Sequence, residues 1–231
     1  MSDKESDAII RKFQEFVHDD TYPCVAARAA LARNQTPCLV VGHMACPKDD
    51  FRILDFIYGF VKDYRLATRS LYSAVIIFEQ PQNLTEEFFE ALLWERLQSL
   101  SQLDAQRYGY DQRVNADPSA SDFSFSLAAE AFFVIGLHPA SERRSRRFAY
   151  PALVFNPHDQ FERMRADNRY EKMKQIVRKR DISYSGSINP MLSDFGEASE
   201  VYQYSGRRHD QEWTCPLKIT HARPDDRRTP E

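Results

Sequence analysis

Apolar residues recur every three or four positions in four stretches of the chain, which is the spacing of one face of an α-helix. These stretches cover residues 9–17, 51–64, 88–100 and 161–177. The small residues at 25–32 predict a further helix. Residues 163–181 carry eight Lys or Arg against three acids, and we interpret this charge as a solvated helix face.

Polar residues indicate where these helices begin and end. Asp49 or Asp50 can cap the helix over 51–64, and Asn83 with Glu86 three residues later forms a capping pair for the next one. The polar pair at 167–168 predicts a break in the last helix.

Five other stretches have the length and composition of β-strands, being continuously apolar, rich in β-branched residues, or alternating. They cover residues 38–44, 71–78, 123–127, 131–137 and 152–155. The short gap after residue 127 predicts an antiparallel hairpin that closes near 128–130. We therefore expect an α+β fold with about five strands in a largely antiparallel sheet and helices packed against it.

The chain changes character from residue 183 onward. This segment holds three of the seven glycines, shows no helical repeat as far as residue 208, and still contains aromatic residues that can pack. A long irregular segment with packing residues is typical of a functional lid. We expect a single domain over 1–221 with this glycine-rich lid, and a charged tail over 222–231.

Composition narrows the class of protein. The 31 basic and 34 acidic residues give a net charge of −3, which argues against a general nucleic-acid binder. The four cysteines form no CxxC pair, the chain begins with acidic residues instead of a signal sequence, and no apolar run reaches the roughly 18 residues of a membrane span. We expect a soluble cytoplasmic protein with reduced thiols and no membrane or nucleic-acid partner.

Two histidines stand at the ends of predicted strands. His138 precedes Pro139, and His158 follows Pro157, while residues 141–147 between them include four arginines. Imidazole binds metals or transfers protons, and arginine binds carboxylate or phosphate through two hydrogen bonds. We expect the two imidazoles and the guanidinium groups to meet in one pocket. Taken separately, each histidine could equally be a hydrogen-bonded residue at the rim of the core.

Several short motifs resemble those of one known family. Tyr-Pro-Cys at 22–24 and Cys-Pro-Leu at 215–217 are similar to the FPC and CPF signatures that bracket the YqcI/YcgG family. Between them, FFVIGLHPAS, ALVFNPHDQFERMR, YEKMKQIVRKRD, GSINPMLSDFGEASE and QYSGR resemble the central and C-terminal blocks of that family, in the same order. The chain differs from the signatures by Tyr in place of the first Phe and Leu in place of the last.

The resemblance implies a heme-dependent monooxygenase, because characterised members of the family hydroxylate a guanidine nitrogen. The cofactor it implies is heme b, and the substrate is arginine or a related small guanidino compound. The oxidant would be O2 with an electron donor, or peroxide. A homodimer is compatible with this expectation.

Heme requires an axial ligand and cationic partners for its propionates. We expect His158 to be the iron ligand, with His138 as the second candidate and the thiolate of Cys24 as the third. The residues expected to pair with the propionates are Arg143, Arg146 and Arg147.

A guanidinium substrate calls for a carboxylate in a pocket that excludes water. The candidates are Glu130, Asp194, Glu197 and Glu200. Ser187 and Asn189 are expected to orient the substrate, and Arg207 to hold its α-carboxylate.

Two other functions are compatible with the same residues. The first is a heme carrier or sensor without turnover. The second is a heme-free hydrolase or metalloenzyme that uses His138, His158 and a carboxylate.

Overall fold

The structure is a computed structural model that describes residues 2–67, 71–189, 191, 195–210 and 212–221. Its centre is one five-stranded sheet with the order β1-β2-β5-β4-β3. The strands are β1 Cys38–His43, β2 Ala74–Gln80, β3 Phe125–Leu127, β4 Glu130–Leu137 and β5 Ala152–Pro157. β1 and β2 are parallel, and the other three neighbouring pairs are antiparallel. The prediction of an α+β fold with a largely antiparallel five-stranded sheet is confirmed.

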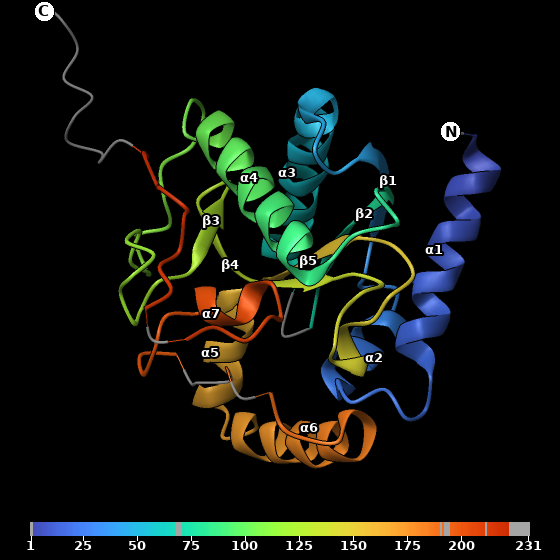
Figure 1. Ribbon diagram of the computed structural model, residues 1–231. Helices are drawn as coiled ribbons and strands as arrows, with labels where there is room; N and C mark the ends of the chain where they lie inside the picture. The colour runs from blue at the N-terminus through green and yellow to red at the C-terminus, as the bar shows by residue number, and fades with distance from the viewer. Residues whose placement is uncertain (1, 68–70, 190, 192–194, 211, 222–231) are drawn as a thin grey trace, which may run out of the picture.

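Helices cover both faces of this sheet (Figure 1). They are α1 Asp3–His18, α2 Val25–Ala32, α3 Asp50–Leu66, α4 Glu86–Asp104, α5 His158–Ala166, α6 Tyr170–Ser185 and α7 Val201–Tyr204, with two short 3-10 turns, η1 Pro47–Asp49 and η2 Arg144–Arg146. The predicted break in the last long helix is confirmed between α5 and α6, where Asn168 has a φ of 56°. No helix of the described residues is both long and apolar enough to cross a bilayer.

Two predictions about helix ends and the lid are wrong in detail, and a third is correct in position only. The N-cap of α4 is Thr85, whose hydroxyl accepts from the backbone N–H of Phe88, and not Asn83. Asp49 is the N-cap residue of α3, as predicted, but it makes no side-chain capping bond, because its carboxylate accepts from the backbone N–H of Gly42 instead. The segment after residue 183 also contains helix, since α6 runs to Ser185 and α7 follows. The predicted tail at 222–231 lies outside the described residues.

Alternation along the strands decides which side chains meet which helices. On β4, the even-numbered Phe132 and Val134 belong to the core cluster that contains α3 and α4, whereas Leu137 belongs to the cluster that contains α1. The register places Phe133 opposite Asn156 and Ile135 opposite Val154, so these four side chains share the face of α1 and α2. Odd-numbered side chains of β4 and even-numbered side chains of β5 therefore lie on the α1/α2 face of the sheet.

The β3–β4 hairpin closes where the sequence predicted it to close. Ala128 and Ala129 form its two-residue turn, with φ angles of 56° and 52°. Positive φ at both positions is the geometry of a tight hairpin turn, in which glycine or asparagine is usual. Here Arg65 holds the turn by donating from Nη2 to the carbonyl oxygens of both alanines, at 3.0 and 2.8 Å.

The C-terminal segment is attached to α4 along much of its length. His209 Nε2 lies 3.0 Å from Glu90 Oε1, and His221 Nε2 lies 3.2 Å from Asp104 Oδ2. Burial opposes ionisation of Glu90, but hydrogen bonds from His209, Arg207 and Ser205 hold the pKa of this carboxyl below its ordinary value. The same C-terminal part of the chain carries α7, which packs against β4, where the Tyr204 hydroxyl donates to the carbonyl oxygen of Phe132.

Candidate functional site

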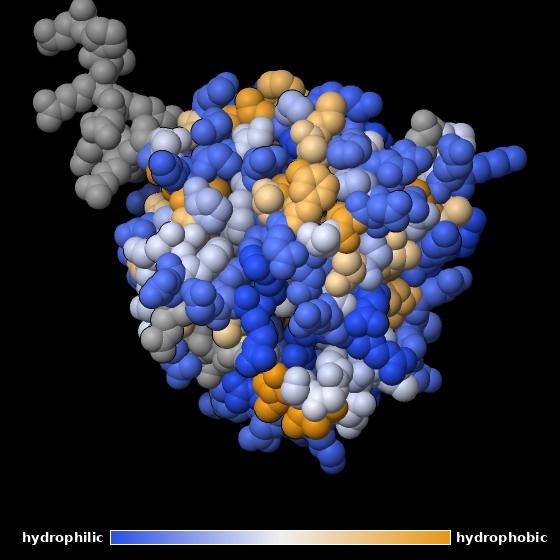
Figure 2. Space-filling view, viewed as in Figure 1, coloured by the Kyte–Doolittle hydropathy of each residue, from blue (hydrophilic) through white to orange (hydrophobic). Residues whose placement is uncertain are grey.

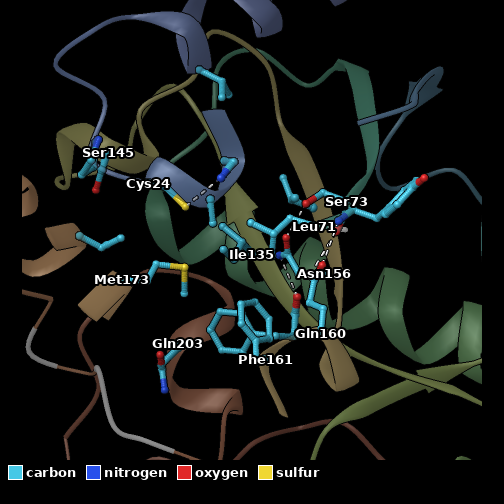
Figure 3. A pocket seen from close by; sticks show the side chains of 18 of the residues that line it. Cys24, Leu71, Ser73, Ile135, Ser145, Asn156, Gln160, Phe161, Met173 and Gln203 are labelled. Carbon is cyan, nitrogen blue, oxygen red and sulfur yellow. Dashed lines mark hydrogen bonds between the residues drawn. The ribbon is translucent and has the colours of Figure 1, made fainter. Parts of the chain in front are cut away.

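A cavity of about 280 Å³ lies between one face of the sheet and the helices that surround it. Its floor is formed by side chains of β4 and β5, and its walls come from α1, α2, α5, α6, α7 and the turn η2 (Figure 3). The lining is mostly apolar and aromatic, which is typical of a small-molecule site. Among its apolar members are Phe13, Tyr22, Phe133, Ile135, Leu137, Val154, Phe161, Met173, Val177 and Phe195.

The burial pattern of the strands shows where this cavity meets the sheet. Phe133 and Ile135 on β4, and Val154 and Asn156 on β5, are only partly buried, although their neighbours along each strand are almost all fully buried. These four positions face the cavity, whereas the alternate positions pack against α3 and α4. A sheet that is solid on one face and open on the other provides a rigid floor for a ligand.

α6 forms the far wall of the cavity. None of its described side chains is fully buried, and its half-buried Met173, Lys174 and Val177 line the cavity. Figure 2 shows apolar surface over α6 and the segment that follows it, and Ile182 of α6 is 48% exposed. This helix is less firmly packed than α3 or α4. The prediction that the basic stretch is entirely a solvated face is wrong for Lys174 and Arg165, which line the cavity.

The floor of the cavity also contains a small cluster of polar side chains. The side chains of Ser73 and Asn156 are joined by a hydrogen bond of 2.7 Å, and Asn156 Nδ2 donates to the carbonyl oxygen of Phe133 at 3.1 Å (Figure 3). Gln160 exchanges two hydrogen bonds with the backbone of Tyr72. These polar side chains were not identified from the sequence. The only available signal was the position of Asn156 beside the Pro-His pair at the end of its strand.

His158 is the histidine that lines the cavity. It is the first residue of α5, follows Pro157 directly, and is 6% exposed. Its ring lies 4.3 Å from the ring of Phe195, centre to centre. Nδ1 lies 3.5 Å from Glu200 Oε1, and Nε2 lies 3.3 Å from Glu162 Oε1. A buried imidazole in an aromatic cavity is a suitable ligand for a metal centre.

His138 does not line this cavity, so the structure does not bring the two imidazoles together as expected. As the next even position after β4, it lies on the α4 side, where its ring stacks on that of Phe89 at 4.2 Å. Gly136 permits this close approach, since a Cβ atom there would be 2.7 Å from the Phe89 ring. Burial, together with the nearby charge of Arg146, lowers the pKa of His138 to about 4. His138 is a neutral core residue near neutral pH.

The arginine run divides among three environments. Arg146 lines the cavity and donates to the carbonyl oxygens of Gly136, Gln203 and Tyr204 at 3.0 to 3.3 Å. It forms no ion pair with the described residues, and burial lowers its pKa to about 10. Arg147 is exposed and donates to nearby backbone carbonyl oxygens.

Arg143 belongs to a second, more polar pocket of about 380 Å³. It pairs there with Asp181 and donates to the carbonyl oxygen of Ser187 at 2.8 Å. Asn189 lines the same pocket. The structure thus groups Arg143, Ser187 and Asn189, but neither Ser187 nor Asn189 lines the cavity of His158.

Of the four carboxylates predicted to bind a guanidinium, Glu200 lines the cavity. Glu130 is buried at the start of β4, where it pairs with Arg65 and Arg113. Glu197 is exposed. Asp194 lies outside the described residues.

Arg207 does not line the cavity either. It pairs with Glu90 at 3.0 Å and with Glu87 at 3.3 Å on α4. The role predicted for Arg207 in holding a substrate carboxylate has no support from this position.

Cys24 lines the cavity at the start of α2, where its Sγ accepts from the backbone N–H of Ala27 at 3.4 Å. Burial raises the pKa of this thiol. Cys24 and Cys215 pack in different core clusters, and all four cysteines are free. In the described part of the chain, no three His, Cys, Asp or Glu side chains are grouped so that they could hold a metal ion.

The fold and the site together define an α+β domain with an apolar cavity, which is lined by a buried histidine and by an arginine that forms no ion pair with the described residues. The model of the YqcI/YcgG family matches residues 13–218, and the chain belongs to this family. It is also similar to the protein described as uncharacterized protein YqcI of Bacillus subtilis (strain 168). The two are 28% identical over 211 residues, which covers 86% of this chain and 81% of that protein. No solved structure matches the chain.

Proposed function

We propose that this protein binds heme b in the cavity and uses it to hydroxylate a guanidine nitrogen of arginine or a related guanidino compound. The observation that carries the proposal is that His158 and Arg146 line the same aromatic cavity. The substrate class rests on the family resemblance.

The residues present fit this group by their chemistry. His158 supplies a buried imidazole, as a heme iron requires. The apolar side chains around it suit the faces of a porphyrin. Arg146, which donates to carbonyl oxygens and has no carboxylate partner among the described residues, supplies a planar cation for a propionate. Arg165 and Lys174 also line the cavity, but they pair with Glu162 and Glu171, so Arg146 is the cation on which the proposal rests.

The size of the cavity sets a condition on binding. At about 280 Å³, it lies at the lower end of the range for ligand pockets. A tetrapyrrole therefore requires an outward movement of a wall, and α6 is the α-helix of the wall that has no fully buried residue among those described. Asn168 before α6 and Gly186 after it both have left-handed backbone, so both ends of the helix are turns at which its direction can change.

Bound heme would supply the iron that activates oxygen. The reaction balances as guanidine N–H plus O2, two electrons and two protons giving N–OH plus water. With hydrogen peroxide it balances as N–H plus H2O2 giving N–OH plus water. In this proposal His158 holds the iron, Arg146 neutralises a propionate, and the apolar walls exclude bulk water.

The test is to express the protein with a heme precursor and record its absorption spectrum. We expect a Soret band, retention of heme in His138→Ala and loss of heme in His158→Ala. Arginine and agmatine are then incubated with the holoprotein and either peroxide or O2 with a reductant. A product heavier by one oxygen atom is the expected result.

Absence of a Soret band after heme reconstitution would overturn the proposal. A Soret band without oxidation of either substrate would instead favour a carrier or sensor. Loss of heme in His138→Ala but not in His158→Ala would show that the ligand assignment is wrong.

A further inference from the structure

Glu200 differs from the other carboxylates near the cavity because its side chain is buried and, among the described residues, accepts hydrogen bonds through one oxygen only. It is 5% exposed. Its Oε2 accepts from the hydroxyl of Ser124 at 3.1 Å and from that of Tyr204 at 3.2 Å. These two hydroxyls fix the carboxylate, and Oε1 is directed toward His158.

The imidazole nitrogen that faces Glu200 Oε1 also lacks a hydrogen-bond partner among the described residues. His158 Nδ1 is buried and makes no hydrogen bond with the described residues, and it lies 3.5 Å from that oxygen. A buried N–H without a partner is costly, and 3.5 Å is only a few tenths of an ångström beyond a good hydrogen bond. A small rotation of the imidazole ring completes the pair.

The other nitrogen of His158 has a different neighbour. Nε2 lies 3.3 Å from Glu162 Oε1, but the Glu162 side chain is 47% exposed and also pairs with Arg165. Glu162 stands one helical turn after His158 and does not line the cavity. It can leave Nε2 for solvent at little cost, whereas Glu200 is fixed by its two hydroxyl partners.

We propose that Glu200 is a positioning residue for His158: its carboxylate accepts the Nδ1 proton, fixes the imidazole ring, and leaves Nε2 as the nitrogen that binds a metal. A carboxylate on the second nitrogen of a ligating histidine sets the tautomer and raises the basicity of the ligand. This assigns Glu200 to His158 and not to the guanidinium of the substrate. The heme part of the inference rests on the proposed function, whereas the tautomer part does not.

The cofactor-free protein provides the first test. Long-range 1H–15N correlation spectra of protein with 15N-labelled histidine report the tautomer of each of the six imidazoles. They are recorded at alkaline pH, at which free imidazole is neutral, and His158 is assigned by its loss in His158→Ala. We expect the Nδ1–H tautomer in the wild-type protein.

Glu200→Gln should invert this tautomer. The hydroxyl of Ser124 needs an acceptor, so it retains the amide oxygen, whereas the Tyr204 hydroxyl can also donate to the carbonyl oxygen of Phe132. The NH2 group then takes the place of Oε1 and donates to Nδ1. The proton then moves to Nε2. Glu162→Gln is the matched control and should keep the Nδ1–H tautomer, as in the wild-type protein.

The inference is overturned if Glu200→Gln keeps Nδ1–H or if Glu162→Gln inverts the tautomer. If Glu200→Gln does not fold, as judged by circular dichroism, Ser124→Ala replaces it. That variant removes one hydroxyl that holds Glu200, and it should give a mixture of tautomers. An unchanged Nδ1–H signal in Ser124→Ala contradicts the inference.

The holoprotein provides the second test. We expect Glu200→Gln to raise the heme dissociation constant about 10- to 100-fold, as is usual when the partner of a ligating histidine is lost. The reduction potential should become more positive, because the lost anion stabilises ferric iron. Glu162→Gln should leave both quantities nearly unchanged.

The two proposals fail in different ways. If the wild-type protein binds no heme, the proposed function fails and the tautomer experiment still decides the role of Glu200. If the wild-type protein binds heme, and Glu200→Gln and Glu162→Gln have the same dissociation constant and potential, the role of Glu200 is wrong and the proposed function stands.

Discussion

The two faces of the sheet are built from the same strands but packed in different ways. On the α3/α4 face, Ile76, Phe89, Leu93 and Phe155 are fully buried in one continuous core. On the opposite face, Phe133 and Val154 remain partly accessible because α6 does not cover them closely. The solid face supplies stability, and the open face has room for a ligand.

Each face contains an arginine that is at least half-buried, Arg96 on the solid face and Arg146 on the open face, and the two differ in their electrostatic partners. On the solid face, Arg96 pairs with the buried Asp50 and donates to the carbonyl oxygen of Met44. On the open face, Arg146 donates only to carbonyl oxygens among the described residues, and its pKa is lowered by burial. Arg96 completes the core, whereas Arg146 keeps a charge available to the cavity.

Replacing these two arginines should give the largest difference in the free energy of unfolding between the two faces. Arg96→Met leaves Asp50 buried without its partner and should lower the free energy of unfolding by about 3–5 kcal/mol. Arg146→Met removes the hydrogen bonds to three carbonyl oxygens but leaves no buried charge without its partner, so it should lower the free energy of unfolding by less, about 1–3 kcal/mol, while weakening heme binding. Urea denaturation of both variants measures the difference. Equal losses would contradict the distinction between the two arginines.

Truncating one apolar side chain on each face gives the next largest effect. Leu93→Ala removes a fully buried side chain from the solid face and should cost about 2–5 kcal/mol. Met173→Ala removes a half-buried side chain that faces the cavity and should cost less than about 1 kcal/mol. Thermal unfolding at one pH measures both. A loss from Met173→Ala as large as that from Leu93→Ala would show that α6 is packed as tightly as α4.

The buried histidine on the solid face, His138, tests the comparison through the pH dependence of stability. The pKa of His138 is lowered to about 4 in the folded protein, whereas an unfolded histidine titrates near 6.5. The unfolded chain therefore binds a proton first, and the contribution of His138 to stability is complete above about pH 6.5 and is lost as the pH falls toward 4. The expected loss is on the order of 3 kcal/mol.

This pH dependence is measured by urea denaturation between about pH 7 and pH 4, around the ordinary histidine pKa. His138→Leu should reduce the slope, because the titrating group in the core is gone. An unchanged slope in His138→Leu would show that other groups account for the acid sensitivity.

Much of the fold could be predicted from local pattern. Five strands, the break between α5 and α6, and the hairpin at Ala128 and Ala129 follow from periodicity and from short-range turn chemistry. The caps were less predictable, since Asn83 and Thr85 are both good capping residues and the geometry of the chain selects between them.

The site was only partly predictable. The sequence identified three chemically suitable residues that line the cavity, His158, Arg146 and Glu200. It did not show that these three lie together or that His138 lies elsewhere. Asn156 and Gln160 were missed because a single polar residue beside an apolar strand carries no signal of its own.

By itself, the sequence determined the helices and strands and the α+β class, because these depend on residues that are near one another in the chain. It also determined which imidazole, guanidinium and carboxylate groups are present. The tertiary structure alone decided which groups meet. Register and parity place His138 against Phe89 and His158 on the opposite face, and α6 stands away from the floor of the cavity. Side-chain sidedness depends on the pairing of strands far apart in sequence, and a local pattern does not contain that information.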